Sequence, residues 1–205
     1  MQSPNESPKH YWRTIANEAL NTITHGIGLA LTSFAIVIQW GFDHLGCLVY
    51  LLSLGSVYFF STLSHGIPGP KRAILRQLDQ GCIFFAIAGT YTPLVLSMSD
   101  NAAHAYILVG EIWLAALIGF VAKVKYRVAT IIPYVVLGWC PALCSPWVFA
   151  NTPLSVGALI VGGGLAYTAG LYFFLRDKTF GYHALWHIFV IAGSALHFAA
   201  IYSIT

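Results

Sequence analysis

Long apolar stretches, separated by short polar segments, recur along the whole chain. A membrane-spanning helix needs about 20 mainly apolar residues, and seven stretches fit that requirement: 22–40, 45–63, 78–97, 105–122, 128–149, 155–175 and 183–203. Backbone groups inside a bilayer find no water and must pair within the helix. The pattern therefore predicts an all-α fold, a bundle of seven transmembrane helices whose short connections make consecutive helices antiparallel neighbours.

The composition supports a surface that faces lipid. Of the 205 residues, 58% are hydrophobic and 8% are charged, whereas a soluble domain carries roughly 25% charged residues. We interpret residues 1–21 as a cytoplasmic N-terminal tail and residues 22–205 as one transmembrane domain. The start is polar and the first apolar run is long enough to remain in the membrane, so no secretory signal is indicated. The four cysteines form no CxxC pair, which argues against a Cys-rich zinc site.

The basic residues predict the orientation in the membrane. All ten Lys and Arg residues fall in the N-terminal tail or in the connections after the second, fourth and sixth stretches. The alternate connections, around Asp43, Asp100 and Asn151, contain none. Because cytoplasmic loops are enriched in Lys and Arg, we expect the N-terminus to be cytoplasmic and the C-terminus to lie outside.

Two stretches have an unusual composition. The fifth contains three prolines, Pro133, Pro141 and Pro146, and is predicted to kink. The sixth has a face of small residues that would let another helix approach closely, made up of Gly162, Gly163, Gly164, Ala166 and Gly170. We interpret both features as packing, with a gating motion as the alternative.

Strongly polar side chains gather at stretch ends on the cytoplasmic side. A charged side chain at the centre of a membrane helix costs roughly 2.5–3.5 kcal/mol on insertion scales, so such groups usually have partners or functions. Ser61 and His65 lie at the end of the second stretch, and Asp79 opens the third. His183 and His187 open the seventh. The topology thus brings residues that are distant in sequence to one depth in the membrane.

The spacing of these residues predicts a metal site. His183 and His187 are four residues apart, which places them on one helix face about 6 Å apart along its axis. Three imidazoles with an open position are typical of a zinc site that keeps a water, and zinc lowers the pKa of that water to about 7. We expect His65, His183 and His187 to bind the ion. Asp79 could ligate it or hold the water, and Ser61 could bond Asp79 or an imidazole.

Each of these residues also has a simpler explanation. An HxxxH pair near a membrane interface is often just solvated, Asp79 could pair with Arg76 or Arg72, and Ser61 could bond its own i−4 carbonyl. The ligand types favour zinc or another late transition metal over magnesium, without separating zinc from iron or manganese.

Three further polar residues receive no assigned role. His25 shares the depth of the predicted site. We expect it either to lie behind the ligands or to face the lipid interface. His197 is ten residues beyond His187, about 15 Å along a helix, and cannot share that ion. Glu111 could line a cavity, but the sequence offers no partner for it.

The segments NEALNTITHGIG, STLSHGIP, LDQGCIFFAIAGTYTP and HALWHIFVIAGSALHF resemble, in order, the motifs of the hemolysin III family, bacterial relatives of the progestin and adipoQ receptors. The resemblance implies a seven-helix protein of the bacterial inner (plasma) membrane with zinc near its cytoplasmic face. It implies that His65, His183 and His187 bind the metal, with Asp79 near the metal-bound water and Ser61 beside it. The superfamily includes alkaline ceramidases, which implies amide hydrolysis of membrane lipid. Gln80 and Ser64 differ from the His and Tyr of many bacterial relatives.

Three hypotheses for function remain open. The first is a zinc-dependent hydrolase or homeostasis factor acting on membrane lipid, in which Asp79 is the general base and Ser61 helps to position the groups. The second is a membrane regulator or receptor-like protein that works through a partner, with a structural zinc joining the second and seventh helices. The third is a pore-forming cytolysin, for which no helix offers a continuous polar stripe. We expect no nucleic-acid partner.

Overall fold

The structure is a computed structural model that describes residues 8–39, 45–145, 150 and 152–205. Within these ranges the chain forms seven α-helices and no strand. In chain order they are α1 (Pro8–Gln39), α2 (Leu45–Gly66), α3 (Lys71–Met98), α4 (Ala102–Tyr126), α5 (Ile131–Cys144), α6 (Leu154–Phe174) and α7 (Tyr182–Tyr202). The prediction of an all-α fold is confirmed, and six of these helices are long and apolar enough to cross a membrane.

The exception is α5, which has 14 residues and is shorter than the predicted stretch 128–149. The helix contains Pro141 and ends at Cys144, with Ser145 as its C-cap. Ser145 precedes a proline in the sequence, and a residue in that position is pushed away from helical backbone angles. The rest of the predicted stretch, residues 146–149 with Pro146, lies outside the described residues.

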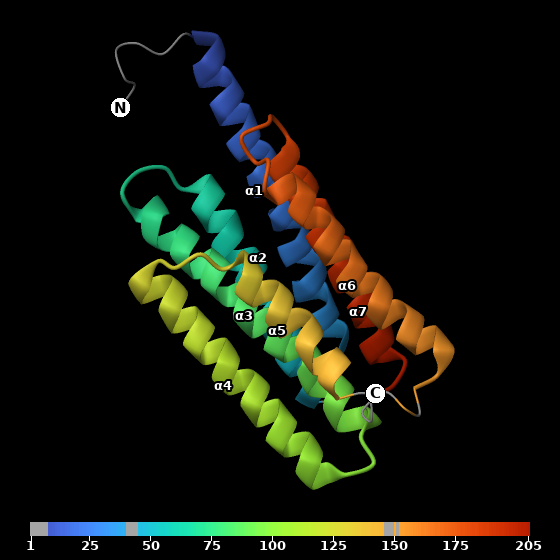
Figure 1. Cartoon of the computed structure of the whole chain (residues 1–205). Coiled ribbons are helices and arrows are strands. Elements are labelled where there is room, and N and C mark those ends of the chain that lie inside the picture. Colours follow the sequence, from blue (N-terminus) through green and yellow to red (C-terminus); the bar gives the residue numbers. More distant parts are fainter. Residues whose placement is uncertain (1–7, 40–44, 146–149, 151) are drawn as a thin grey trace.

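The first helix is longer than the hydropathy pattern predicted. It begins at Pro8, well before residue 22, and its apolar window already opens at Trp12. The added turns carry polar residues such as Glu18 and Asn21, which lower the local hydropathy but find partners on other helices. Figure 1 shows the N-terminal end of α1 extending beyond the neighbouring helices.

Consecutive helices pack side by side over most of the bundle (Figure 1): α1 on α2, α2 on α3, α3 on α4, and α6 on α7. The first helix also contacts α7, which closes the bundle around α2 and α3. One core cluster joins α2, α3 and α7 through residues such as Tyr50, Leu94 and Ile201. A second joins α3 and α4 through Phe84 and Ile112.

Small residues of α6 lie where α7 comes closest, as the packing interpretation requires. A Cβ atom at Gly163 would be 2.2 Å from the His197 ring, and one at Gly170 would be 2.7 Å from Trp186. Gly164 faces a different helix, because a Cβ there would be 3.1 Å from the Trp139 ring of α5.

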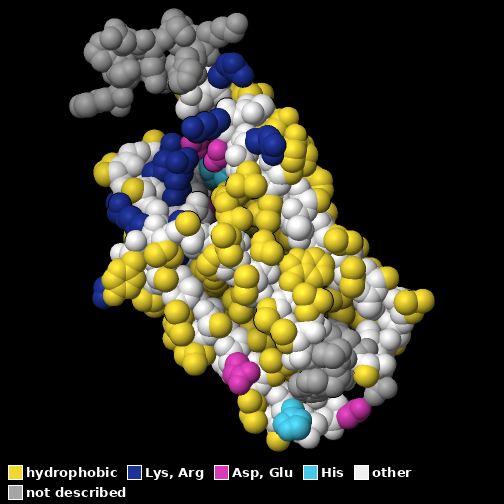
Figure 2. Space-filling view, viewed as in Figure 1, with side chains coloured by type: hydrophobic (Ala, Val, Ile, Leu, Met, Phe, Trp, Pro, Cys, Tyr) yellow, Lys and Arg dark blue, Asp and Glu magenta, His cyan; other side chains and the backbone are white. Residues whose placement is uncertain are grey.

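The surface is divided between apolar flanks and a basic end. Figure 2 shows hydrophobic side chains over most of the visible face, with Lys and Arg gathered at one end of the bundle. Large apolar side chains such as Phe34, Leu114 and Ile188 are more than half exposed on the helices. Apolar exposure on this scale is expected of a surface that contacts lipid. The protein is therefore a multi-pass membrane protein.

Candidate metal centre

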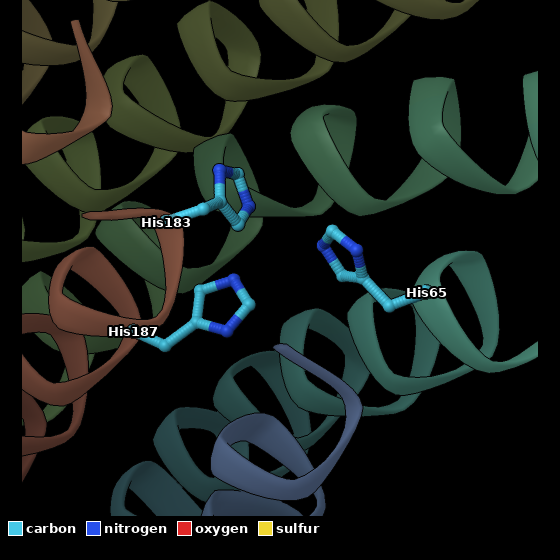
Figure 3. Close-up of side chains that lie close together, drawn as sticks. All are labelled: His65, His183 and His187. Atoms are coloured by element: carbon cyan, nitrogen blue, oxygen red, sulfur yellow. The ribbon is translucent and has the colours of Figure 1, made fainter. Parts of the chain in front are cut away.

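Three histidines converge at the basic end of the bundle (Figure 3). His65, His183 and His187 each offer a nitrogen, and the three nitrogens lie within 4.8 Å of one another. The ring centroids are 4.9 Å apart for His65 and His183, 5.3 Å for His65 and His187, and 4.6 Å for His183 and His187. The structure therefore brings together the three residues that the sequence predicted as ligands.

The ends of two helices place these rings. His65 lies in the last turn of α2, and His183 and His187 occupy the first two turns of α7. The chain turns into α7 at Gly181, whose φ of 80° is in the left-handed region that glycine adopts readily. The Gly181 N–H donates to Asn17 Oδ1 at 2.9 Å, which ties the start of α7 to α1.

The histidine cluster fits a transition-metal ion. Zinc binds imidazole nitrogen at about 2.0–2.1 Å, so two nitrogens of a tetrahedral site are about 3.4 Å apart. The nitrogens in this cluster lie within 4.8 Å of one another, so the rings would turn inward to bind one ion. Three neutral nitrogen ligands suit zinc and other late transition metals better than magnesium or calcium, which prefer oxygen. The geometry does not identify the metal.

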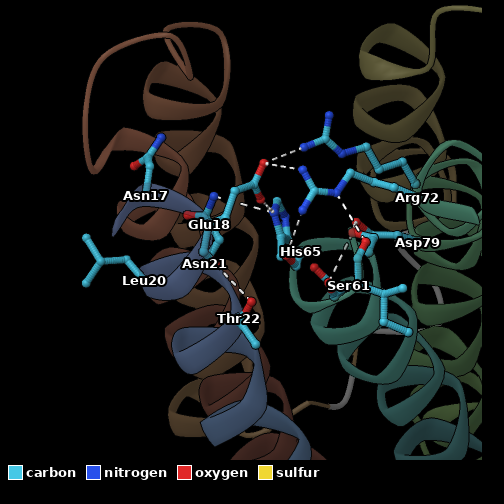
Figure 4. Close-up of polar contacts among 12 residues, drawn as sticks. Asn17, Glu18, Leu20, Asn21, Thr22, Ser61, His65, Arg72 and Asp79 are labelled. Atoms are coloured by element: carbon cyan, nitrogen blue, oxygen red, sulfur yellow. Dashed lines mark hydrogen bonds and ion pairs between the residues drawn. The ribbon is translucent and has the colours of Figure 1, made fainter. Parts of the chain in front are cut away.

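A carboxylate lies behind His65, on the first helix (Figure 4). Glu18 Oε2 is 2.6 Å from His65 Nδ1, and Glu18 Oε1 accepts from Arg76 at 2.9 Å and from Arg72 at 3.3 Å. Arg72 also donates to the backbone carbonyl of His65 at 3.3 Å. Both arginines that could have paired with Asp79 thus have Glu18 as their carboxylate partner.

His187 of α7 has two neighbours on α1. Thr24 Oγ1 is 2.9 Å from His187 Nδ1. The ring of His25 stacks on that of His187 with a centroid distance of 3.4 Å. His25 is 3% exposed, so it does not lie at the lipid interface, which was one of the two positions expected for it. Its edge contact with Tyr58, at 5.1 Å between centroids, continues the cluster toward the middle of the bundle.

The two predicted catalytic residues, Asp79 and Ser61, lie beside the cluster and beside each other. Ser61 is fully buried, and its Oγ has no hydrogen-bond partner among the described residues. Ser64 donates to the Ser61 carbonyl at 3.0 Å, and Asp79 Oδ2, at 3.5 Å, is a weak second acceptor of the same proton. Ser64 occupies the position where many bacterial relatives were expected to carry tyrosine.

A cavity of about 190 Å³ leads from the cluster into the bundle. Ser61, Asp79, His183 and His187 line one part of it, together with His25. The remaining lining comes mostly from apolar residues of α3, α5, α6 and α7, with Tyr167 and His197 among the polar ones. Glu111, which was considered as a cavity residue, is exposed on α4 and does not line this cavity.

Sequence reasoning placed His25 at the depth of the site but did not predict the contacts that Glu18 and Thr24 of the same helix make with the histidines. The available signal was their common helix face, because positions 18, 21, 24 and 25 recur at intervals of three or four residues. His197 is held elsewhere, with Nε2 at 3.0 Å from the Ile160 carbonyl of α6.

Comparison with known proteins shows the family to which this chain belongs. A protein-family model described as "Haemolysin-III related" matches residues 13–198. The chain is 32% identical to Hemolysin-3 of Bacillus cereus over 200 residues, 91% of each chain. It is 32% identical to the Hemolysin-3 homolog of Bacillus subtilis (strain 168) over 201 residues, 92% of this chain and 94% of the other. The human monocyte to macrophage differentiation factor is 31% identical over 166 residues, 75% of this chain and 68% of the other. The chain belongs to the hemolysin III family, the relatives of the progestin and adipoQ receptors.

Proposed function

We propose that this protein is a zinc-dependent hydrolase of membrane lipid, acting on an amide or ester bond. The observation that carries the proposal is the position of the three-histidine cluster beside an apolar cavity that also contains the Asp79 carboxylate. A bound zinc would supply Lewis-acid polarisation of the substrate carbonyl and would activate water for attack.

The position of each residue indicates the role that we propose for it. His65, at the end of α2, and His183 and His187, at the start of α7, would hold the ion. Asp79 would accept a proton from the attacking water, and the Ser64 hydroxyl lies beside its carboxylate, 3.5 Å from Oδ2. Ser61, whose buried hydroxyl lacks a partner among the described residues, is available to bond a polar group of the substrate.

The cavity supports a lipid as substrate. Apolar side chains from five helices, including Ile83, Leu94 and Val190, line it beyond the histidine end. An acyl chain could bury its methylene groups there, each contributing about 0.8 kcal/mol, while its polar end reaches Asp79 and the histidines.

The membrane placement belongs to the same proposal. We place the protein in the bacterial inner (plasma) membrane with seven spans, α5 being the short one. The N-terminal segment up to residue 21, whose later part forms the first turns of α1, lies on the cytoplasmic side, residues 22–205 form a single transmembrane domain, and the C-terminus lies outside. The gathering of Lys and Arg at one end of the bundle supports this orientation.

Lipid mass spectrometry on the purified protein in vesicles tests the activity. We expect zinc-loaded protein to release fatty acid from an amide-linked or ester-linked lipid, and His187→Ala and Asp79→Asn to abolish the release. His104→Ala and Glu111→Ala, which change exposed residues of α4, are the matched controls and should retain it. Release that persists in His187→Ala at equal protein level would contradict the proposal.

The alternative function is a purely structural zinc, which the same lipid assay and the variant His65→Ala distinguish from a catalytic one. In that case no lipid product forms in the loaded wild-type protein, and His65→Ala lowers the unfolding temperature sharply because α2 and α7 lose their link.

A further inference from the structure

One face of α1 contacts both helices that carry the histidine cluster. Asn17, Glu18, Asn21, Thr24 and His25 recur at helical spacing and share that face. Asn17 accepts from the backbone at the start of α7, Glu18 reaches His65 on α2, and Thr24 reaches His187 on α7. The helix thus touches two of the three candidate ligands at their Nδ1 atoms.

The Thr24 hydroxyl determines which nitrogen of His187 is free. Oγ1 lies 2.9 and 3.0 Å from the carbonyl oxygens of Leu20 and Asn21, the usual acceptors for a threonine hydroxyl within a helix, and its single proton bonds one of them or is shared between them. With the proton on that side, Oγ1 accepts toward His187 Nδ1, at 2.9 Å. His187 Nδ1 therefore carries the ring proton, and Nε2 keeps the lone pair that a metal ion needs.

Glu18 has the same effect on His65. A carboxylate that receives hydrogen bonds from Arg72 and Arg76 is an acceptor, so the 2.6 Å contact places the proton on His65 Nδ1. Asn21 Nδ2 also approaches this nitrogen, but at 3.5 Å it is at the limit of hydrogen-bonding distance and the carboxylate contact dominates. His65 Nε2 is left free.

We infer that Glu18 and Thr24 are positioning residues, which hold His65 and His187 as Nε2 ligands and so set the affinity of the centre for its metal. The inference rests on the proposed metal centre. Partners of this kind fix the orientation and basicity of ligand imidazoles, and their loss typically weakens metal binding by about 10- to 100-fold. The first helix thereby controls metal retention without contributing a ligand.

Thr24 allows a closely matched test, because Thr22 lies on the same helix. Each hydroxyl donates to the carbonyl four residues earlier, Thr22 to Glu18 and Thr24 to Leu20, but only Thr24 contacts a histidine. We expect Thr24→Val to raise the zinc dissociation constant, measured by chelator competition in detergent, by about 10- to 100-fold. Thr22→Val should leave it unchanged, and Thr24→Ser, which restores the hydroxyl, should recover the wild-type value.

A second readout separates positioning from folding. Co²⁺ replaces zinc and reports ligand geometry through its visible absorption. We expect the Co²⁺ spectrum to change in Thr24→Val and in Glu18→Ala while the unfolding temperature of Thr24→Val matches that of Thr22→Val. Glu111→Ala, which removes an exposed carboxylate of α4, is the control for Glu18→Ala.

The outcomes separate the inference from the function on which it rests. If wild-type protein binds no zinc or Co²⁺, the proposed metal centre fails. If wild-type protein binds metal and Thr24→Val and Glu18→Ala bind it equally well with an unchanged spectrum, the centre stands and the positioning role of α1 is overturned.

Discussion

The imidazole ring of His25 lies against that of His187, with 3.4 Å between the centroids and 18° between the planes. Because the two rings are stacked, the lone pairs of their nitrogens lie in two nearly parallel planes. An ion in the plane of the His187 ring, about 2.0–2.1 Å from its nitrogen, would therefore lie outside the plane of the His25 ring, in which the His25 lone pairs point. Neither His25 nitrogen has a hydrogen-bond partner within the described part of the chain. The geometry favours His25 as a packing partner of His187 over a fourth ligand.

Replacement of His25 by phenylalanine tests this assignment. His25→Phe keeps an aromatic ring on His187 and removes both nitrogens, so we expect the metal-to-protein ratio to match that of the wild-type protein. Metal analysis after detergent purification gives the answer, with His187→Ala as the variant that should lose metal. A folded His25→Phe protein that lacks metal would show that His25 is a ligand.

The contact between α6 and α7 depends on Gly163. In Gly163→Ala the new Cβ would lie 2.2 Å from the His197 ring and 3.0 Å from the Gly193 carbonyl oxygen. Overpacking of this kind costs about 1–3 kcal/mol, and the unfolding temperature in detergent should fall. Gly162→Ala is the control, because its nearest neighbour, Leu196, would be 3.6 Å away. Equal unfolding temperatures for the two variants would refute the close approach.

Ser194 joins two tyrosines of different helices, the buried Tyr58 of α2 and the half-buried Tyr167 of α6. Its hydroxyl donates to the Val190 carbonyl at 2.8 Å and accepts from Tyr58 at 3.0 Å and from Tyr167 at 2.7 Å. Ser194→Ala leaves both phenol groups without this acceptor, at a cost of about 1–3 kcal/mol for each unsatisfied group.

Thermal unfolding of Ser194→Ala should therefore occur at a lower temperature than that of Ser203→Ala. Ser203 also donates to the carbonyl four residues earlier, Ala199, at 2.7 Å, but it is exposed. If Ser194→Ala unfolds at the same temperature as Ser203→Ala, the network of tyrosines does not stabilise the bundle.

Much of the histidine cluster was predictable because helix geometry is regular. Two histidines four residues apart lie on one face of α7, and the alternation of basic connections places the end of α2 beside the start of α7. These two reasons place His65, His183 and His187 at one depth, and the packing of α2 with α7 in one core cluster brings them together.

The contacts of α1 were not predictable in the same way. Whether Glu18 faces His65 or only the arginines depends on the rotation of α1 and on its depth in the bundle, and hydropathy determines neither. Likewise Asp79 was considered as the partner of Arg72 or Arg76, because the sequence cannot rank two carboxylates for one guanidinium. The length of α5 was overestimated because its apolar run continues past the point where the helix ends, at Cys144.

The membrane orientation can be tested by cysteine labelling in a variant without its four native cysteines. Lys71→Cys and Lys178→Cys lie at the basic end, and Ala103→Cys lies at the start of α4. We expect an impermeant thiol reagent added outside the cell to label Ala103→Cys only, because the proposed orientation places the connections before α3 and α7 in the cytoplasm. External labelling of Lys178→Cys but not of Lys71→Cys would separate α2 from α7 and exclude a shared ion.

The central claim is that His65, His183 and His187 hold one metal ion between α2 and α7. Metal analysis of the detergent-purified wild-type protein, beside the double variant His183→Ala/His187→Ala, tests it most directly. We predict close to one zinc per chain in the wild-type protein and almost none in the double variant. Wild-type protein without bound metal after zinc supplementation, or a double variant that binds as much as the wild type, would contradict the claim.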